Sequence, residues 1–406
     1  MTKLLSILKE RVVAHFDLDS FFVSVEILKN SALKNKPVVL GSKGDRGVVS
    51  ACSYEARIFG IRSGMPMRLA LQLCPELLQI RGDHDQYSYY SNIVTDIVSE
   101  NVPLYEKTSI DEFYIDLTGM DKFFGTYKFT KELRKSIIHE TGLPISFGLS
   151  TNKTVAKVAT NEGKPNGENK VNYGYEKPFL APLIVNKIPY IGDKTSNLLQ
   201  QMGIKYVHTI QEMPPEAFRQ LLGKNGLILW KRANGIDNSP VAPYSERKSI
   251  SLEQTFHQDT IDVEMLNSIL LGMTEKLAIQ LRKEKKLTAC ISVKIRYSNF
   301  DTYTKQMRIG YNSCDHVLIK SVKELFKKLY NRRMLIRLIG VKFSHLVYGN
   351  YQIDLFEDSL EMINLYKAMD NVNKRYGLGS IKRAASINTD EKSLNSFHSK
   401  SIRNAK

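Results

Sequence analysis

The fold is decided by the stretch at positions 12–22, which reads Val12-Val13-Ala14-His15-Phe16-Asp17-Leu18-Asp19-Ser20-Phe21-Phe22. Its apolar run predicts a buried strand over 12–17 that ends in carboxylates, and a helix follows over 21–29. Further strands are predicted over 105–117 and 144–150. Strands and helices mixed in this way predict an α+β domain in which carboxylates stand at the end of a strand.

The composition is that of a basic globular protein. The 406 residues include 58 Lys or Arg and 42 Asp or Glu, a net charge of +16, with 42% hydrophobic and 25% charged residues. Two to four domains are expected at this length. A positive excess attracts nucleic acid, an anionic membrane surface or phosphorylated ligands, and composition does not choose among these three.

Several classes of protein are not expected. No apolar stretch approaches the length of a membrane span, and the segment Leu4 to Leu8 is too short for a signal peptide. We therefore expect a cytoplasmic protein with no membrane partner. The cysteines show no CxxC spacing, so we expect reduced thiols rather than a zinc site or disulfides. They are Cys52, Cys74, Cys290 and Cys314.

The positive charge is concentrated in one module. Positions 247–346 hold 19 Lys or Arg and 9 Asp or Glu, a net +10. The module is predicted to contain strands over 249–256, 287–298, 302–309 and 336–347 and helices over 262–285 and 314–330. Before it, positions 234–245 read as a Gly- and Pro-containing linker, and 173–235 as mostly helical. After it comes a tail with a peptide-like motif, an amphipathic stretch and a basic end.

Two groups of carboxylates are embedded in apolar sequence, Asp17 and the pair Asp111 and Glu112. Buried carboxylates are costly unless they are paired or bind a cation. Three that converge would suit one or two Mg²⁺ ions, which can assist phosphoryl transfer. The alternative is a helix cap for Asp19 and surface strand ends for the others. Because neighbouring strand residues point to opposite faces, convergence requires a hairpin turn near 109–112.

An ordered set of motifs resembles the Y-family of translesion DNA polymerases, and most closely its DinB branch. The resemblance covers about residues 10–346 of the chain. The motifs are Phe16-Asp17-Leu18-Asp19-Ser20-Phe21-Phe22, Ser53-Tyr54-Glu55-Ala56-Arg57, Ser109-Ile110-Asp111-Glu112, Lys164-Pro165-Asn166-Gly167, Ile188-Pro189-Tyr190-Ile191-Gly192, Arg247-Lys248-Ser249-Ile250 and Arg337-Leu338-Ile339-Gly340-Val341. Each motif alone is a weak signal, but the ordered set is specific.

The resemblance implies a multidomain α+β right-hand polymerase. Its expected parts are a palm over 1–25 and 83–172, fingers over 26–82, a helical thumb over 173–237, a linker over 238–246, an α+β little finger over 247–346 and a tail over 347–406. The implied reaction adds a dNTP to a primer 3′-hydroxyl on a DNA template, with low fidelity and no proofreading, in DNA repair and the replication of damaged DNA.

The resemblance also implies two Mg²⁺ ions in the palm. Asp17, Asp111 and Glu112 match the catalytic metal ligands, and the backbone oxygen of Leu18 matches a further ligand. Asp19 is not a ligand by this matching, so we expect it to cap the helix that begins near Ser20.

Five residues match the family's nucleotide contacts. Phe22 matches the steric gate, which occupies the space of a ribose 2′-hydroxyl, and Phe21 precedes it. Tyr54, Arg57 and Lys164 match residues that hold the triphosphate, since guanidinium and ammonium groups pair with phosphate oxygens. The alternatives are core aromatics and solvated charges. Positions 48 and 51 depart from many relatives.

DNA and clamp contacts are implied in the second half of the chain. Gly192 and Lys194 belong to an expected helix-hairpin-helix whose backbone binds a DNA phosphate. Candidate phosphate contacts in the basic module are Lys248, Arg296, Lys305, Arg308, Arg332 and Lys342. The segment 352–356 resembles the peptide motif that binds the bacterial sliding clamp. Gln352, Leu355 and Phe356 are expected to contact the clamp. The expected partners are primer-template DNA, dNTPs and the clamp, and the chain is expected to be a monomer.

Three other functions compete with this interpretation. A nucleotide cyclase could use similar carboxylates but would not need the expected thumb hairpin, basic module or clamp peptide. A UmuC-type polymerase subunit would depend on an accessory protein, and the segment 54–57 favours DinB. A non-catalytic DNA- or clamp-binding scaffold would not need all three carboxylates.

Overall fold

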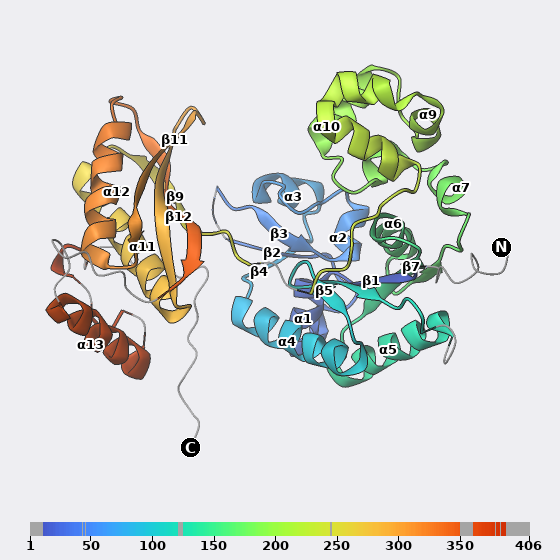
Figure 1. Cartoon of the computed structure of the whole chain (residues 1–406), viewed down its shortest axis with the longest axis horizontal. Coiled ribbons are helices and arrows are strands. Elements are labelled where there is room, and N and C mark those ends of the chain that lie inside the picture. The colour runs from blue at the N-terminus through green and yellow to red at the C-terminus, as the bar shows by residue number, and fades with distance from the viewer. Residues whose placement is uncertain are drawn as a thin grey trace, which may run out of the picture. The chain divides into compact units, whose positions relative to one another are not determined.

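A computed structural model describes residues 11–42, 44, 46–120, 125–243, 246–349, 360–377, 379–381 and 383–386. The chain divides into two compact units, Met1–Ser245 and Glu246–Lys406 (Figure 1). Each unit combines helices with a sheet, so the predicted α+β class is confirmed. Within the described residues, no helix has both the length and the apolar character needed to cross a lipid bilayer.

The first unit is built on a five-stranded sheet with the order β5-β6-β1-β7-β8. Its strands are β5 (Tyr105–Lys107), β6 (Glu112–Asp116), β1 (Val13–Leu18), β7 (Ile145–Ser150) and β8 (Glu168–Lys170). The central strand β1 is buried along its whole length, which explains its continuous apolar run.

Helices cover both faces of this sheet. One face packs against α1 (Phe21–Lys29), α4 (His84–Asn101) and α5 (Thr126–Thr141), and α6 (Lys153–Gly163) lies on the other face (Figure 1). The absence of a side chain at Gly148 on β7 lets α6 approach closely. A Cβ atom there would lie 2.2 Å from the backbone oxygen of Ala156 and 2.5 Å from the nitrogen of Thr160.

A smaller sheet is formed by the segment between β1 and β5, which was expected to form the fingers. Its order is β3-β2-β4, with β2 (Val38–Gly41), β3 (Val49–Cys52) and β4 (Leu78–Ile80). Two helices, α2 (Tyr54–Ile58) and α3 (Met67–Leu73), share a separate apolar cluster with it, and η2 (Ser31–Leu33) precedes β2. Ser53 begins α2, since its Oγ accepts a hydrogen bond from the Ala56 nitrogen at 3.2 Å.

The following segment is helical, as predicted. It contains α7 (Glu176–Leu180), η3 (Val185–Lys187), α8 (Asp193–Gln201), α9 (Val207–Glu212) and α10 (Pro215–Ala233). The structure differs from the expected helix-hairpin-helix in its first element. The short 3₁₀ helix η3, and not an α-helix, directly precedes the turn that leads into α8.

The described residues of the predicted linker, up to 243, have no regular secondary structure, but they pack against the rest of the first unit. Val241 is buried with Val13 and Tyr114. The Ala242 nitrogen donates to Glu106 at 2.7 Å, and Asn152 donates to the Gly235 oxygen at 2.9 Å. These contacts hold the chain against the sheet as it leaves α10, which composition alone did not predict.

The second unit has a four-stranded antiparallel sheet with the order β11-β10-β12-β9. Its elements are β9 (Ser249–Thr260), α11 (Val263–Lys283), β10 (Lys286–Tyr297), β11 (Thr302–Asn312), α12 (Asp315–Leu329) and β12 (Ile336–Tyr348). All six elements predicted for the basic module are therefore confirmed, in the predicted order. The two helices pack against one face of the sheet (Figure 1).

Part of the tail is folded onto the second unit. It forms α13 (Leu360–Tyr376), followed by η4 (Ala384–Ser386). Tyr366 of α13 is fully buried, and its hydroxyl lies 2.9 Å from His316 Nδ1. Arg282 of α11 donates to Asp370 of α13 at 2.6 and 2.8 Å and to Asp315 of α12 at 2.6 Å. The clamp-like residues Gln352, Leu355 and Phe356 lie outside the described residues.

Candidate active site

The hairpin between β5 and β6 brings the predicted carboxylates to one end of the sheet. Lys107 pairs with Phe113, and the Thr108 nitrogen donates to the Glu112 oxygen at 3.1 Å, so the turn spans 108–111. The turn expected near Ser109 is therefore confirmed. The Asp111 carbonyl accepts from the nitrogen of Leu18 at 3.1 Å, next to Asp17 of β1.

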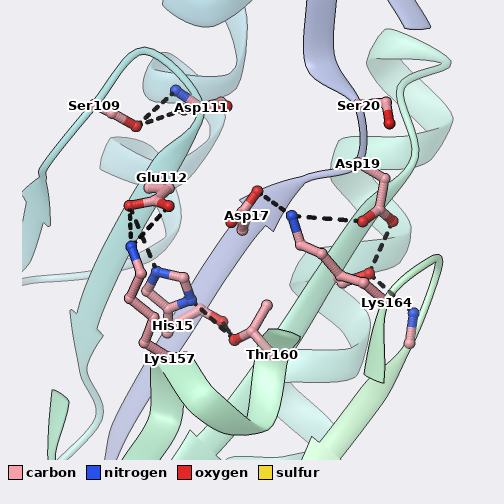
Figure 2. Close-up of polar contacts among 12 residues, drawn as sticks. His15, Asp17, Asp19, Ser20, Ser109, Asp111, Glu112, Lys157, Thr160 and Lys164 are labelled. Atoms are coloured by element: carbon pink, nitrogen blue, oxygen red, sulfur yellow. Dashed lines mark hydrogen bonds and ion pairs between the residues drawn. The ribbon is translucent and has the colours of Figure 1, made fainter. Parts of the chain in front are cut away.

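Asp17 and Glu112 are direct cross-strand neighbours in the β1–β6 register, so their side chains share one face of the sheet (Figure 2). Asp111 stands at the end of β6, where its Oδ1 accepts from Ser109 Oγ at 2.5 Å. The geometry thus places all three predicted metal ligands at the same strand end. The backbone of Leu18 lies there as well.

Lysines are the present partners of two of these carboxylates. Lys157 of α6 donates to both oxygens of Glu112, at 2.8 and 2.7 Å, and Lys164 forms an ion pair with Asp17 (Figure 2). Among the described residues, no three acidic, histidine or cysteine side chains are grouped so that they could hold a metal ion. Binding of a metal would require Lys157 and Lys164 to move away from the carboxylates.

The environment of Asp17 fits a cation. Burial raises the pKa of Asp17 to about 7, Lys164 opposes that rise, and the charges of Glu112 and Asp111 add to it. A divalent cation between the oxygens of Asp17, Glu112 and Asp111 would neutralise their negative charges and so favour the ionised form of Asp17. The donors are all carboxylate or carbonyl oxygens, the type of ligand that Mg²⁺ prefers.

Asp19 is a structural hub and not a helix cap, so that expectation was wrong. The residue that precedes α1 is Ser20, whose side chain makes no capping hydrogen bond. Asp19 is 1% exposed and accepts from Ser146 Oγ at 2.8 Å, from the Asn166 nitrogen at 2.7 Å and from the Tyr54 hydroxyl at 3.2 Å. It therefore joins β1 to β7, to the loop after α6 and to α2.

The three predicted triphosphate contacts converge around this hub. Tyr54 and Arg57 are on the same side of α2, with the guanidinium carbon 4.5 Å from the centre of the Tyr54 ring. Arg57 donates to Ser20 Oγ at 3.3 Å, and Lys164 Nζ lies 3.7 Å from Asp19. Burial raises the pKa of the Tyr54 hydroxyl, and the charge of Asp19 raises it further, so this hydroxyl remains a donor.

The two aromatic residues at the start of α1 have different surroundings. Phe21 is 3% exposed and belongs to the core, as the alternative interpretation of this residue proposed. Phe22 is partly exposed and stacks on Tyr87, with ring centres 4.4 Å apart and planes at 19°. The Tyr87 hydroxyl donates to Glu26 at 2.8 Å, which fixes the ring beneath Phe22.

His15 is a buried member of the site that the sequence interpretation did not single out. Its Nδ1 lies 2.9 Å from Thr160 Oγ1, and its Nε2 lies 4.0 Å from Glu112 and has no hydrogen-bond partner in the described part of the chain. Burial lowers its pKa, and the nearby Lys157 and Lys164 lower it further, so the ring is neutral. Its place in the apolar run beside Asp17 was the available signal.

The expected DNA contacts lie on exposed surface in both units. Gly192 and Lys194, at the start of α8, are exposed, and a Cβ atom on Gly192 would meet nothing within 4 Å. Lys248 is exposed just before β9, and Arg332 is exposed after α12. Arg296 is partly exposed on β10 and donates to Thr302 Oγ1 at 2.8 Å.

Two family models match the chain. The impB/mucB/samB family matches residues 16–161, and the C-terminal domain of the same family matches residues 247–355. These two stretches include the strand-end carboxylates and the whole sheet of the second unit.

Relatives and solved structures extend the match over most of the chain. A DNA polymerase IV of Dehalococcoides mccartyi is 37% identical over 92% of this chain and 96% of its own. One from Treponema denticola is 33% identical over 95% of this chain and 99% of its own.

A Y-family DNA polymerase chimera has a TM-score of 0.74 at 26% identity and covers 83% of this chain and 100% of its own. DinB from Sulfolobus solfataricus has a TM-score of 0.60 at 26% identity, over 84% of this chain and 100% of its own. With the palm-like sheet, its strand-end carboxylates and the second α+β unit already described, these matches show that the chain belongs to the Y-family of DNA polymerases, in the DNA polymerase IV branch.

Proposed function

We propose that this Y-family DNA polymerase adds dNTPs to the 3′-hydroxyl of a primer by a two-metal-ion mechanism. Two Mg²⁺ ions would be held by Asp17, Asp111 and Glu112, with the backbone oxygen of Leu18 as a further ligand. The observation that carries the proposal is the direct pairing of Asp17 with Glu112 in the β1–β6 register, with Asp111 at the adjoining turn.

The chain's own residues perform the binding and selection steps. When bound, the ions supply charge that favours deprotonation of the primer hydroxyl and release of pyrophosphate. Arg57 and Lys164 pair with triphosphate oxygens, and the protonated Tyr54 hydroxyl donates to one. Phe22, held by Tyr87, fills the space that a ribose 2′-hydroxyl would need.

Lys157 and Lys164 act as exchangeable partners of the carboxylates. Each ammonium neutralises a carboxylate of the site, which lowers the cost of bringing Asp17 and Glu112 together. With Asp17 holding a cation, Lys164 would be free to pair with the triphosphate, next to Arg57 and Tyr54 on the other side of Asp19.

The wider role follows from the family. We propose translesion synthesis with low fidelity and without proofreading, on primer-template DNA held by Gly192, Lys194 and the basic second unit. The protein would act as a cytoplasmic monomer and would bind the sliding clamp through the segment 352–356. The DNA polymerase IV relatives support this role over a UmuC-type subunit or a non-catalytic scaffold.

Primer extension with Mg²⁺ on undamaged and lesion-bearing templates tests the proposal. The double variant Asp111→Asn, Glu112→Gln keeps the shape of both side chains and removes their charge, so we expect extension to fall at least about 10³-fold. Asp116→Asn, at the other end of β6, is the matched control, because its oxygen can still accept from the Thr118 nitrogen. Equal extension by the double variant and the control would reject the assigned site.

A further inference from the structure

The register of the second sheet sorts its basic residues onto two faces. Ile291, Val293 and Ile295 of β10 face the helices α11 and α12 and belong to the apolar core. The residues that alternate with them, Ser292, Lys294 and Arg296, therefore point to the open face. The partners of β10 follow the same alternation, because directly opposite residues share a face.

The candidate phosphate contacts do not all share the open face. Arg308 pairs with Cys290 and Lys342 with Ser292, so these two side chains lie on the same face as Arg296. Lys305 pairs with Val293, and its neighbour Tyr303 pairs with Ile295, so both lie on the helix side of the edge strand β11.

On that helix side the structure contains a basic hollow of about 340 Å³. Its walls include Lys305 and Tyr303 of β11, Lys328 of α12, and Asn331 and Arg332 of the following turn. The Arg332 guanidinium lies over the Tyr303 ring, 4.8 Å from its centre, and Tyr303 is 37% exposed. The hollow thus combines three cations with a partly exposed aromatic ring, which also meets the Tyr297 ring edge-on at 5.9 Å between ring centres.

The counter-charges of this hollow are weak. Lys328 pairs with Glu324, and Arg332 Nη1 lies 3.7 Å from Asp301, in both cases between side chains that are about half exposed. Exposed pairs of this kind contribute about 0–1 kcal/mol, so a phosphate can replace the carboxylates. Lys305 has no ion pair in the part of the chain that the structure describes.

We propose that this hollow binds an unpaired nucleic-acid strand, with phosphates on Lys305, Lys328 and Arg332 and a base stacked at Tyr303. Positive charge beside an exposed aromatic ring is the pattern that binds single strands without reading their sequence. A duplex lying on the open face is too stiff to bend round the edge strand β11, whereas a single strand can do so. The hollow is therefore a second nucleic-acid site, and the proposal assigns Lys305 and Arg332, which the sequence offered as duplex contacts, to the single strand instead.

The test compares the two faces in the full-length protein without Mg²⁺ or dNTP. Fluorescence anisotropy measures the Kd for a labelled oligo-dT strand and for a blunt duplex. The hollow variant Lys305→Gln, Arg332→Gln should weaken oligo-dT binding about tenfold and leave duplex binding unchanged. The open-face variant Arg308→Gln, Lys342→Gln is the matched control and should do the reverse.

The salt dependence and the aromatic ring provide independent readouts. Loss of two single-strand phosphate contacts should reduce the slope of log Kd against log salt concentration by about 1.4. Tyr303→Leu should weaken oligo-dT binding without changing that slope, because stacking releases no counterions. The charge-conserving variant Lys305→Arg, Arg332→Lys should retain most of the affinity.

Three results would overturn the proposal. The first is an oligo-dT Kd that is unchanged in the hollow variant, and the second is an equal loss of duplex and oligo-dT binding in that variant. The third is displacement of labelled oligo-dT by inorganic tripolyphosphate as effectively as by unlabelled oligo-dT, at equal concentrations of phosphate groups. That result would indicate a site for free anions. Thermal unfolding of each variant checks that the fold is retained. The assay requires no catalysis, so failure of the two-metal proposal would leave its outcome intact.

Discussion

Lys164 forms an ion pair with Asp17. The lysine proposed to bind the triphosphate therefore contacts the carboxylate proposed to bind a metal ion. The same ammonium is 3.7 Å from Asp19, the buried hub that also accepts from Tyr54. Metal binding and triphosphate binding are therefore linked through a single lysine. If Asp17 binds a metal ion, the Lys164 ammonium becomes available to the nucleotide.

Lys164→Met tests this link. The variant loses one triphosphate contact, so we expect KM for dNTP to rise about tenfold or more. It also removes the ammonium that competes for Asp17 and that lowers the pKa of this carboxyl, so at alkaline pH, where Asp17 stays ionised, Mg²⁺ should bind the nucleotide-free protein more tightly and raise its Tm more than in the parent. Lys170→Met, an exposed lysine on β8, is the control and should change neither quantity.

Phe22→Ala should reduce discrimination against ribonucleotides by about tenfold or more, because the steric exclusion of the 2′-hydroxyl is removed. Single-nucleotide insertion of dNTP and rNTP measures the ratio of kcat/KM. Phe21→Leu is the comparison, since Phe21 is buried in the core: it should lower stability and keep the selectivity. If Phe22→Ala keeps the parent selectivity, Phe22 is not the gate.

Tyr87→Phe separates the support of the gate from the gate itself. The ring that stacks on Phe22 is retained, but the buried carboxylate of Glu26 loses a 2.8 Å hydrogen bond. We expect the free energy of unfolding to fall by about 1–3 kcal/mol in urea titrations, with ribonucleotide discrimination unchanged. Tyr89→Phe, at a position 59% exposed on the same helix, should be neutral.

Val241→Asp should release the linker from the sheet of the first unit. The variant would bury a charge between Val13 and Tyr114, which is unfavourable without a partner. Limited proteolysis should then cut within 234–245 faster than in the parent, and the unfolding free energy of the first unit should drop by about 1–3 kcal/mol. Asn238→Asp adds the same charge at an exposed position and should leave both measurements unchanged.

Tyr366→Ala tests the docking of α13. Tyr366 is fully buried, and its hydroxyl contacts His316, so truncation should cost the second unit about 3–5 kcal/mol. Tyr376→Ala, at a position 67% exposed on the same helix, is the control. Equal urea midpoints for the two variants would show that α13 contributes nothing to the stability of the unit.

Much of the fold could be predicted from local pattern. The apolar run that becomes β1 and the alternation that becomes β9 to β12 are properties of short segments. The apolar side chains of these segments are buried because they avoid water, whatever their partners are. The strand-end carboxylates Asp17 and Glu112 could be recognised for the same reason, since charges are rare in apolar runs.

The remaining contacts depend on residues far apart in the chain. Asp19 was expected to cap a neighbouring helix, yet it bonds to Ser146, which is 127 positions away. His15 reaches Thr160 across 145 positions, because Gly148 lets α6 approach the sheet. The packing of Val241 and Tyr366 has the same origin, and no local pattern specifies a partner at such a distance.

The docking of α13 has a consequence for work with isolated fragments. Arg282 and Asp315 are held in a buried network with Asp370 of α13 and with Arg383, whose Nη1 lies 3.1 Å from Asp315. A fragment that stops at Gly349 would keep both buried charges but lose two of their partners. A stable recombinant version of the second unit should therefore extend through Ser386.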